Sequence, residues 1–212
     1  MQTVRHDVEE MRSHLLPRVL GPKEAGYELV PGQLAVGLFL DTVEGARAID
    51  KRDVKRWALS PEALMSTAVD NLRLRSSMES WYPLRAVPGM QVYLAGDGNA
   101  ASRLLLIREL IKPWPLGGVL ASVPTPDQLL VVPMDDLDHL ATVQVLVQSG
   151  YLAHSLGSEP VIDQVFWHDG VRWHHVQVNH LEDTVEVLPP PGFLKMVERL
   201  ASLQLAQRVG EA

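Results

Sequence analysis

The chain has 212 residues, enough for one sizeable domain or two small ones, and its 46% hydrophobic and 21% charged residues are typical of a globular protein. Its formal net charge of −7 argues against nucleic acid as the main ligand, because phosphate binding relies on clustered Lys and Arg. The chain has no cysteine, which excludes disulfides, thiolate metal sites and cysteine nucleophiles.

No apolar run approaches the ~20 residues that a membrane-spanning helix needs. The polar residues 1–7 also lack the apolar stretch of a secretory signal. We therefore expect a cytoplasmic protein that binds neither membrane nor nucleic acid. The one tight basic group, Lys51-Arg52 with Lys55-Arg56, is interrupted by Asp50 and Asp53.

The first predicted elements are a helix over residues 2–16 and two strands over 26–30 and 33–41. Apolar residues recur at helical spacing in the first segment (Val4, Val8, Met11 and Leu15), and Pro17 ends it, so residues 1–25 are interpreted as a helix and a connector. The second strand is almost continuously apolar, which predicts a strand covered on both faces.

A helix over residues 60–74 has the clearest start signal. Ser60 can cap the first amide groups, Pro61 suits the first helical position, and Glu62 favours the positive end of the helix dipole. The buried stripe of this helix is predicted to hold Leu64, Ala68 and Leu72.

The rest of the chain alternates between hairpins and helices. Strands are predicted over 81–86, 91–94, 118–123 and 128–132, with helices over 99–111 and from Asp135-Asp136 to Gly150. A hairpin within residues 161–180 pairs 161–168 with 171–178 around Asp169-Gly170, a dipeptide typical of a two-residue type I′ turn. The last element is a helix over 192–208.

These elements predict an α+β fold, a mainly antiparallel sheet built from hairpins alternating with helices, in a single domain over residues 1–212. One sheet is expected to carry strands 34–40, 91–94, 118–123 and 128–132, with helices 60–74 and 99–111 packed on it. Its predicted core residues include Phe39, Leu64, Leu72, Leu104 and Leu105.

Three segments resemble the YtpQ-like family, a bacterial group containing a domain of unknown function. They are residues 57–64 with Asn71-Leu72, residues 96–106 and residues 120–130. The chain departs from the family pattern at Asn99 and Ala100, where the family usually has a bulkier residue and a carboxylate. The resemblance implies a bacterial intracellular protein and supplies no activity.

The turn that precedes residues 99–111 is the first candidate ligand site, with Gly96, Asp97, Gly98, Asn99 and Arg103. Such a turn can aim backbone amides at an anion, and Arg103, expected to be partly exposed, could hold a phosphate. The structural alternative is favoured. In it the glycines allow a tight turn, Asp97 or Asn99 caps the helix, and Arg103 pairs with an acid.

The second candidate site is the C-terminal hairpin, whose Trp167, His168, Trp173 and His175 could contact a protein partner. With a two-residue turn, His168, Trp173 and His175 share one face, and His174 and His180 share the other. No three histidines therefore converge with a carboxylate unless another element contributes a ligand. Acids in the first turn of a helix explain Asp135, Asp136 and Asp138 without a cation. No metal or other cofactor is expected.

No convergent catalytic set is found, so the leading hypothesis is a non-enzymatic binding or adaptor protein that acts through protein–protein contacts. The alternative is an enzyme or binder of a phosphorylated small molecule at the Gly96–Arg103 turn. The sequence identifies neither the partner nor the oligomeric state.

Overall fold

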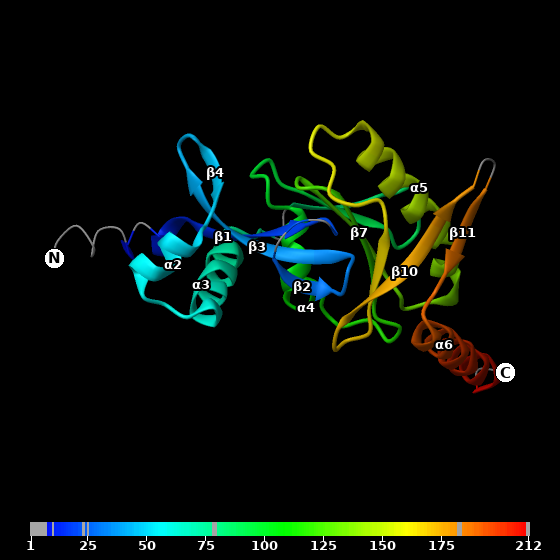
Figure 1. Cartoon of the computed structure of the whole chain (residues 1–212). Coiled ribbons are helices and arrows are strands. Elements are labelled where there is room, and N and C mark those ends of the chain that lie inside the picture. The colour runs from blue at the N-terminus through cyan, green and yellow to red at the C-terminus, as the bar shows by residue number, and fades with distance from the viewer. Residues whose placement is uncertain are drawn as a thin grey trace. The chain divides into compact units, whose positions relative to one another are not determined.

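A computed structural model describes residues 8–9, 11–22, 24, 26–77, 80–181 and 184–210, the last four of them as backbone only (Figure 1). The chain divides into two compact units, residues 1–78 and 79–212. The single domain over residues 1–212 stays a prediction.

The first unit is built on a small antiparallel sheet of order β1-β3-β2, with β4 paired to β3. Strand β3 is the longest, and β1 pairs with it from Leu15 opposite Leu40 to Leu20 opposite Ala35. The strands are β1 (Leu15–Leu20), β2 (Tyr27–Val30), β3 (Leu34–Thr42) and β4 (Gly45–Ala48); the helices are α2 (Lys51–Trp57) and α3 (Pro61–Leu74).

Helix α3 begins where the sequence predicts. The Ser60 hydroxyl accepts a hydrogen bond from the Ala63 amide at 3.2 Å, and Pro61 occupies the first turn. The predicted stripe of Leu64, Ala68 and Leu72 is buried, at 0–1% exposure. Helix α3 packs on β1 and β3, and the core between them contains Met11, Leu15, Leu38, Trp57, Leu64 and Ala68.

The predicted helix over residues 2–16 is wrong at its C-terminal end. Residues 8–9 and 11–14 are helical, but Leu15 and Leu16 already belong to strand β1, and residues 1–7 and 10 lie outside the described residues. Pro17 is tolerated inside this strand because β1 lies at the edge of its sheet, where an amide donor is not required on the outer side.

The second unit contains a seven-stranded sheet of order β11-β10-β9-β7-β8-β6-β5, in which every described pairing is antiparallel. The strands are β5 (Trp81–Pro83), β6 (Gln91–Leu94), β7 (Val119–Thr125), β8 (Gln128–Pro133), β9 (Val165–His168), β10 (Trp173–His180) and β11 (Val185–Leu188). The helical segments are η2 (Ala101–Leu106), α4 (Ile107–Leu110), η3 (Leu137–His139), α5 (Leu140–Leu156) and α6 (Pro191–Gly210). The α+β class is therefore confirmed.

The expected single sheet is wrong, because strand 34–40 lies in the sheet of the first unit and strands 91–94, 118–123 and 128–132 lie in that of the second. Of the predicted core residues, Leu64, Leu72 and Leu104 are at most 1% exposed. Phe39 and Leu105 are only half-buried. Strands β4 and β11 and helix α2 have no counterpart among the predicted elements.

Two helices differ from their predictions for local reasons. Residues 99–111 form a 3-10 segment followed by one α-helical turn, because the amides of Ser102 and Arg103 donate to carbonyls three residues back. Helix α5 continues past Gly150 to Leu156. A Cβ at position 150 would lie 2.5 Å from the Ser122 hydroxyl, so this glycine allows close packing on β7 and does not end the helix.

The C-terminal hairpin of β9 and β10 is confirmed with a longer connection than expected. His168 pairs with Trp173, and residues 169–172 form the turn. The Asp169 carboxylate accepts hydrogen bonds from the amides of Val171 and Arg172, which fixes this wider turn. The C-terminal helix α6 is also found. Its residues Phe193, Met196 and Leu200 are buried in the hydrophobic core of the second unit.

Candidate functional site

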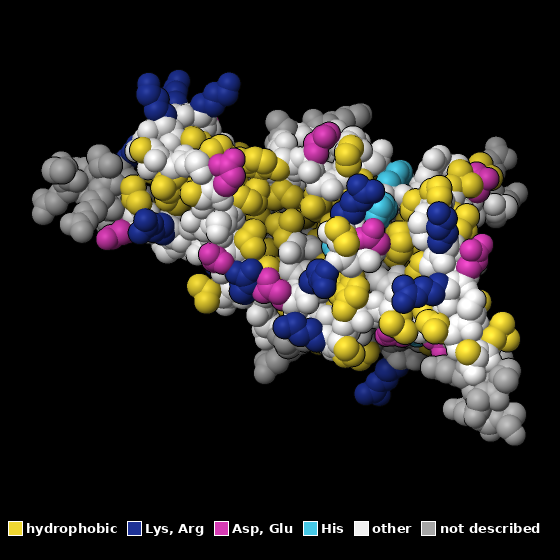
Figure 2. Space-filling model, turned by 90° about the horizontal axis from the view of Figure 1, so that it is seen from below, with side chains coloured by type: hydrophobic (Ala, Val, Ile, Leu, Met, Phe, Trp, Pro, Cys, Tyr) yellow, Lys and Arg dark blue, Asp and Glu magenta, His cyan; other side chains and the backbone are white. Residues whose placement is uncertain are grey.

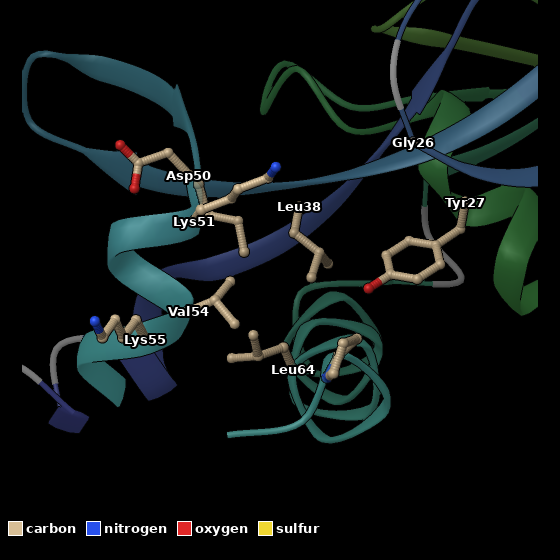
Figure 3. A pocket seen from close by; sticks show the side chains of 10 residues that line it. Gly26, Tyr27, Leu38, Asp50, Lys51, Val54, Lys55 and Leu64 are labelled. Atoms are coloured by element: carbon tan, nitrogen blue, oxygen red, sulfur yellow. The ribbon is translucent and has the colours of Figure 1, made fainter. Parts of the chain in front are cut away.

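A cavity of about 490 Å³ opens in the first unit among α2, α3 and strands β2 and β3 (Figure 3). Its floor is apolar and is formed by Leu38 from β3, Val54 from α2 and Leu64 from α3, together with Ile49. Leu38 and Leu64 are 6% and 1% exposed, so the floor belongs to the hydrophobic core of this unit.

Charged and aromatic side chains form the rim of this cavity. Tyr27 comes from β2, and Asp50, Lys51 and Lys55 come from the start and outer side of α2. In Figure 3 the Tyr27 hydroxyl points toward the apolar side chains, and Lys51 extends toward Leu38. Lys55 and the Asp50 carboxylate point away. The rim therefore presents one ammonium group and one phenol to the cavity.

The acids next to Lys51 are already engaged. The Asp50 carboxylate caps α2, accepting from the amides of Arg52 at 2.6 Å and Asp53 at 3.0 Å. Asp53 pairs with Arg47 at 2.6 Å, and the hydrogen bond from Arg47 holds the pKa of Asp53 below its usual value. Within the described part of the chain, no acid forms an ion pair with Lys51 or Lys55.

On the surface of the first unit, hydrophobic side chains are exposed on one face, and Lys and Arg side chains project beside them (Figure 2). Exposed apolar surface rimmed by charged groups is a feature of binding sites.

The turn at Gly96–Arg103 forms a closed network. The guanidinium of Arg103 binds Asp97 at two points, Nη1 to Oδ1 at 3.0 Å and Nη2 to Oδ2 at 2.8 Å. Arg103 is 1% exposed and lies over the ring of Tyr93, 4.9 Å from its centroid, so the expected partial exposure is wrong. Burial alone would raise the pKa of Asp97, but the hydrogen bond and charge of Arg103 lower it overall.

Backbone amides of this turn also have partners inside the chain. The Gly98 amide donates to the Asp127 carboxylate at 2.8 Å, the Asn99 amide to Asp97 at 3.0 Å, and the Ala101 amide to the Pro126 carbonyl at 2.9 Å. Gly98 has a φ of +67°, whereas Gly96 does not have a positive φ. This geometry supports the structural interpretation, and ligand binding by Gly96, Asp97, Gly98, Asn99 and Arg103 stays a prediction.

The aromatic residues of the C-terminal hairpin pack inside the fold. Trp167, His168 and Trp173 are 5–7% exposed, and His175 is half-buried. The Trp167 indole donates to the Gly117 carbonyl at 2.8 Å. Contact of these residues with a protein partner stays a prediction.

The histidines of the hairpin lie on two faces, as the sequence predicts. His168 contacts Trp173 on one face, with ring centroids 4.8 Å apart, and His174 lies beside Trp167 on the other. Burial lowers the pKa of both His168 and His175. Burial opposes ionisation of Asp169, but hydrogen bonds from the Arg172 amide, His174 and the Val171 amide lower its pKa to about 2.

No group of three or more His, Asp or Glu residues that could hold a metal ion is present in the described part of the chain. Among the helices described, none is long and apolar enough to cross a bilayer.

Comparison with models of protein families, with curated proteins and with solved structures gives no match. Membership of the YtpQ-like family therefore stays a prediction, based on residues 57–64, 96–106 and 120–130.

The cavity in the first unit is the site that sequence reasoning missed. Its lining residues are spread from position 26 to position 64 and meet only in the folded unit. One signal was available. Lys51 and Lys55 are separated by one helical turn and flank Val54, which is the pattern of a short amphipathic helix with a basic edge.

Proposed function

We propose that this chain is a non-enzymatic binding protein and that the cavity of the first unit holds its ligand through an apolar group. The observation that carries the proposal is the combination of a cavity of about 490 Å³ with an apolar floor and an exposed rim. Small-molecule pockets are typically about 300–1,000 Å³, mainly apolar, and carry a few polar groups that orient the ligand.

The chemistry of the lining supports binding rather than catalysis. The ten lining residues include no histidine, serine or threonine, so they contain no pair of a hydroxyl nucleophile and an imidazole base. The carboxylate of Asp50 is held by the amides of α2 and points away from the cavity.

A neutral apolar fluorophore, N-phenyl-1-naphthylamine, tests the proposal on the full chain. We expect saturable binding with increased fluorescence, and chemical-shift changes at the methyl groups of Leu38, Val54 and Leu64. Val54→Phe should weaken binding by filling the cavity. Val171→Phe is the matched control, because Val171 is 86% exposed in the turn of the C-terminal hairpin.

The chemical-shift changes at these methyl groups locate the fluorophore in the wild-type chain without relying on any variant. If the fluorophore binds without shifting these methyl groups, or if Val54→Phe binds it like the wild type while folding normally, the cavity is not the binding site. If the wild-type chain does not bind it, the proposal fails, and the sequence-based hypothesis of a protein partner is favoured instead.

A further inference from the structure

We infer that the ligand of this cavity is a small amphipathic carboxylate, a molecule with an apolar chain and a single negatively charged head group. The inference rests on the proposed function, because it specifies the chemistry of the ligand in the same cavity. The apolar floor accommodates the chain, and Lys51 with Tyr27 binds the head group.

The charge at the rim carries the inference. Lys51 extends toward the cavity and forms no ion pair with the described acids of the chain. The carboxylate of Asp50 is bound to two amides of α2, and that of Asp53 is bound to Arg47. Because the neighbouring acids are engaged elsewhere, a ligand carboxylate would not compete with them for the Lys51 ammonium group.

Tyr27 supplies a second donor from the opposite side of the cavity. Its side chain is 48% exposed, and its hydroxyl forms no hydrogen bond to the rest of the described chain. In Figure 3 this hydroxyl points toward Leu38 and Leu64. A phenol and an ammonium group at the edge of an apolar floor match the two oxygens of a carboxylate, since hydrogen bonds to a charged group are the stronger kind.

The number of charges selects among possible head groups. A cationic head would be repelled by Lys51, and a neutral head would leave the ammonium group without an ionic partner. A dianion would need a second cation, but Lys55 points away from the cavity. A single negative charge is therefore the best match for the rim, whose other side chains directed at the cavity are apolar or phenolic.

The inference is tested with decanoate, 1-decanol and decylammonium, titrated calorimetrically into the full chain below the micelle concentrations of the two ionic probes and below the aqueous solubility of 1-decanol. We expect decanoate to bind about tenfold more tightly than 1-decanol and decylammonium to bind most weakly. Octanoate should bind about fifteenfold more weakly than decanoate, because it lacks two methylenes and each buried methylene contributes about fourfold to affinity.

Variants assign the head group to its partners. Lys51→Met should reduce decanoate affinity about tenfold while leaving 1-decanol affinity unchanged, and Tyr27→Phe should reduce it by a smaller factor. Arg52→Met is the matched control. It removes the same charge from the same helix at a position that does not line the cavity, so decanoate affinity should stay within about twofold of the wild type.

The outcomes separate this inference from the proposed function. If 1-decanol and decanoate bind equally and Lys51→Met has no effect, the carboxylate is not recognised, although the cavity still binds apolar ligands. If Arg52→Met weakens decanoate binding as much as Lys51→Met, the effect is general electrostatics, and the inference is also overturned. If no ten-carbon probe binds while the fluorophore does, only the carboxylate inference fails; if neither the fluorophore nor any ten-carbon probe binds, both proposals fail.

Discussion

Arg103 and Asp97 form a two-point ion pair in which the arginine side chain is 1% exposed and the aspartate side chain 34%. Such a pair has a large effect when one member is removed, because the other charge stays buried. The Arg73–Asp70 pair in the first unit is much more exposed, at 45% and 63%. Exposed pairs contribute about 0–1 kcal/mol.

We predict that Asp97→Ala lowers the free energy of unfolding by about 3–5 kcal/mol, since it leaves the Arg103 guanidinium without its carboxylate. Asp70→Ala should lower it by at most about 1 kcal/mol. Denaturant unfolding curves of the two variants beside the wild type give both values. Similar small losses would mean that Arg103 is stabilised mainly by its other contacts.

A double variant separates the effect of the buried charge from the effect of the turn geometry. When Asp97→Ala is combined with Arg103→Met, neither charge of this ion pair remains, and the methionine can still pack on Tyr93. The double variant should therefore recover much of the lost stability, as replacement of buried ion pairs by apolar side chains often does. No recovery would show that the geometry of the turn, rather than the buried charge, determines stability here.

The Gly96–Asn99 turn contains two glycines with different backbone demands, which makes them a matched pair. Gly98 has a φ of +67°, a conformation that a Cβ disfavours, whereas Gly96 does not have a positive φ and a Cβ there would meet nothing within 4 Å. We predict that Gly98→Ala costs about 1 kcal/mol or more, and that Gly96→Ala stays within about 0.5 kcal/mol. Thermal melts measure both changes, and equal losses would contradict the prediction.

Local signals account for the parts of the fold that the sequence predicted. Helix α3 is specified by Ser60, Pro61 and a buried stripe within its own segment, so no distant contact is needed to find it. The faces of the C-terminal hairpin were also predicted correctly, although the pairing differs. A two-residue turn would place His168 opposite Val171, and the observed partner is Trp173. A shift of two residues leaves every side chain on the same face of a strand.

Tertiary contacts determine the parts that the sequence did not predict. Leu15 fits a helical stripe as well as a strand, and only pairing with Leu40 of β3 selects the strand. Arg103 is buried against Tyr93, a contact between strand β6 and the 3-10 segment η2. The cavity likewise requires Tyr27, Leu38, Val54 and Leu64 to meet from four elements, and no local pattern encodes that meeting.

Gly150 provides a test of helix–sheet packing, because alanine normally stabilises the interior of a helix by about 1 kcal/mol relative to glycine. Here a Cβ would lie 2.5 Å from the Ser122 hydroxyl and 3.3 Å from its Cβ, so helix α5 would be pushed away from β7. We predict that Gly150→Ala is destabilising in denaturant melts, by about 1–3 kcal/mol.

Ser122 offers the corresponding rescue. Its hydroxyl is buried and has no hydrogen-bond partner in the described part of the chain, so Ser122→Ala alone should be neutral or stabilising. Combined with Gly150→Ala, it removes the closer of the two clashes and should restore part of the stability. Strict additivity of the two single changes would show that these residues do not press on each other in the folded protein.

The last prediction concerns the pH dependence of the second unit. His168 is 6% exposed, and its Nδ1 accepts a hydrogen bond from the Gly170 amide at 3.0 Å, so the neutral imidazole fits the site and a proton on Nδ1 would break this bond. Burial is the main cause of its lowered pKa; Arg108 and His174 lower it further, and Asp169 partly opposes them.

The lowered pKa of His168 determines how the free energy of unfolding changes with pH. A histidine whose pKa is lowered on folding contributes stability that is fully present above the unfolded value of about 6.5 and is lost as the pH falls through the folded value. We predict that the free energy of unfolding decreases below about pH 6.5. His168→Asn, which keeps an acceptor near the Gly170 amide but cannot ionise, should make this decrease shallower. Burial also lowers the pKa of His175, so part of the dependence of the unfolding free energy on pH remains until His175 is replaced as well. Unfolding curves between neutral and mildly acidic pH measure this dependence. If it is unchanged in a variant in which both His168 and His175 are replaced, the two histidines are not its cause.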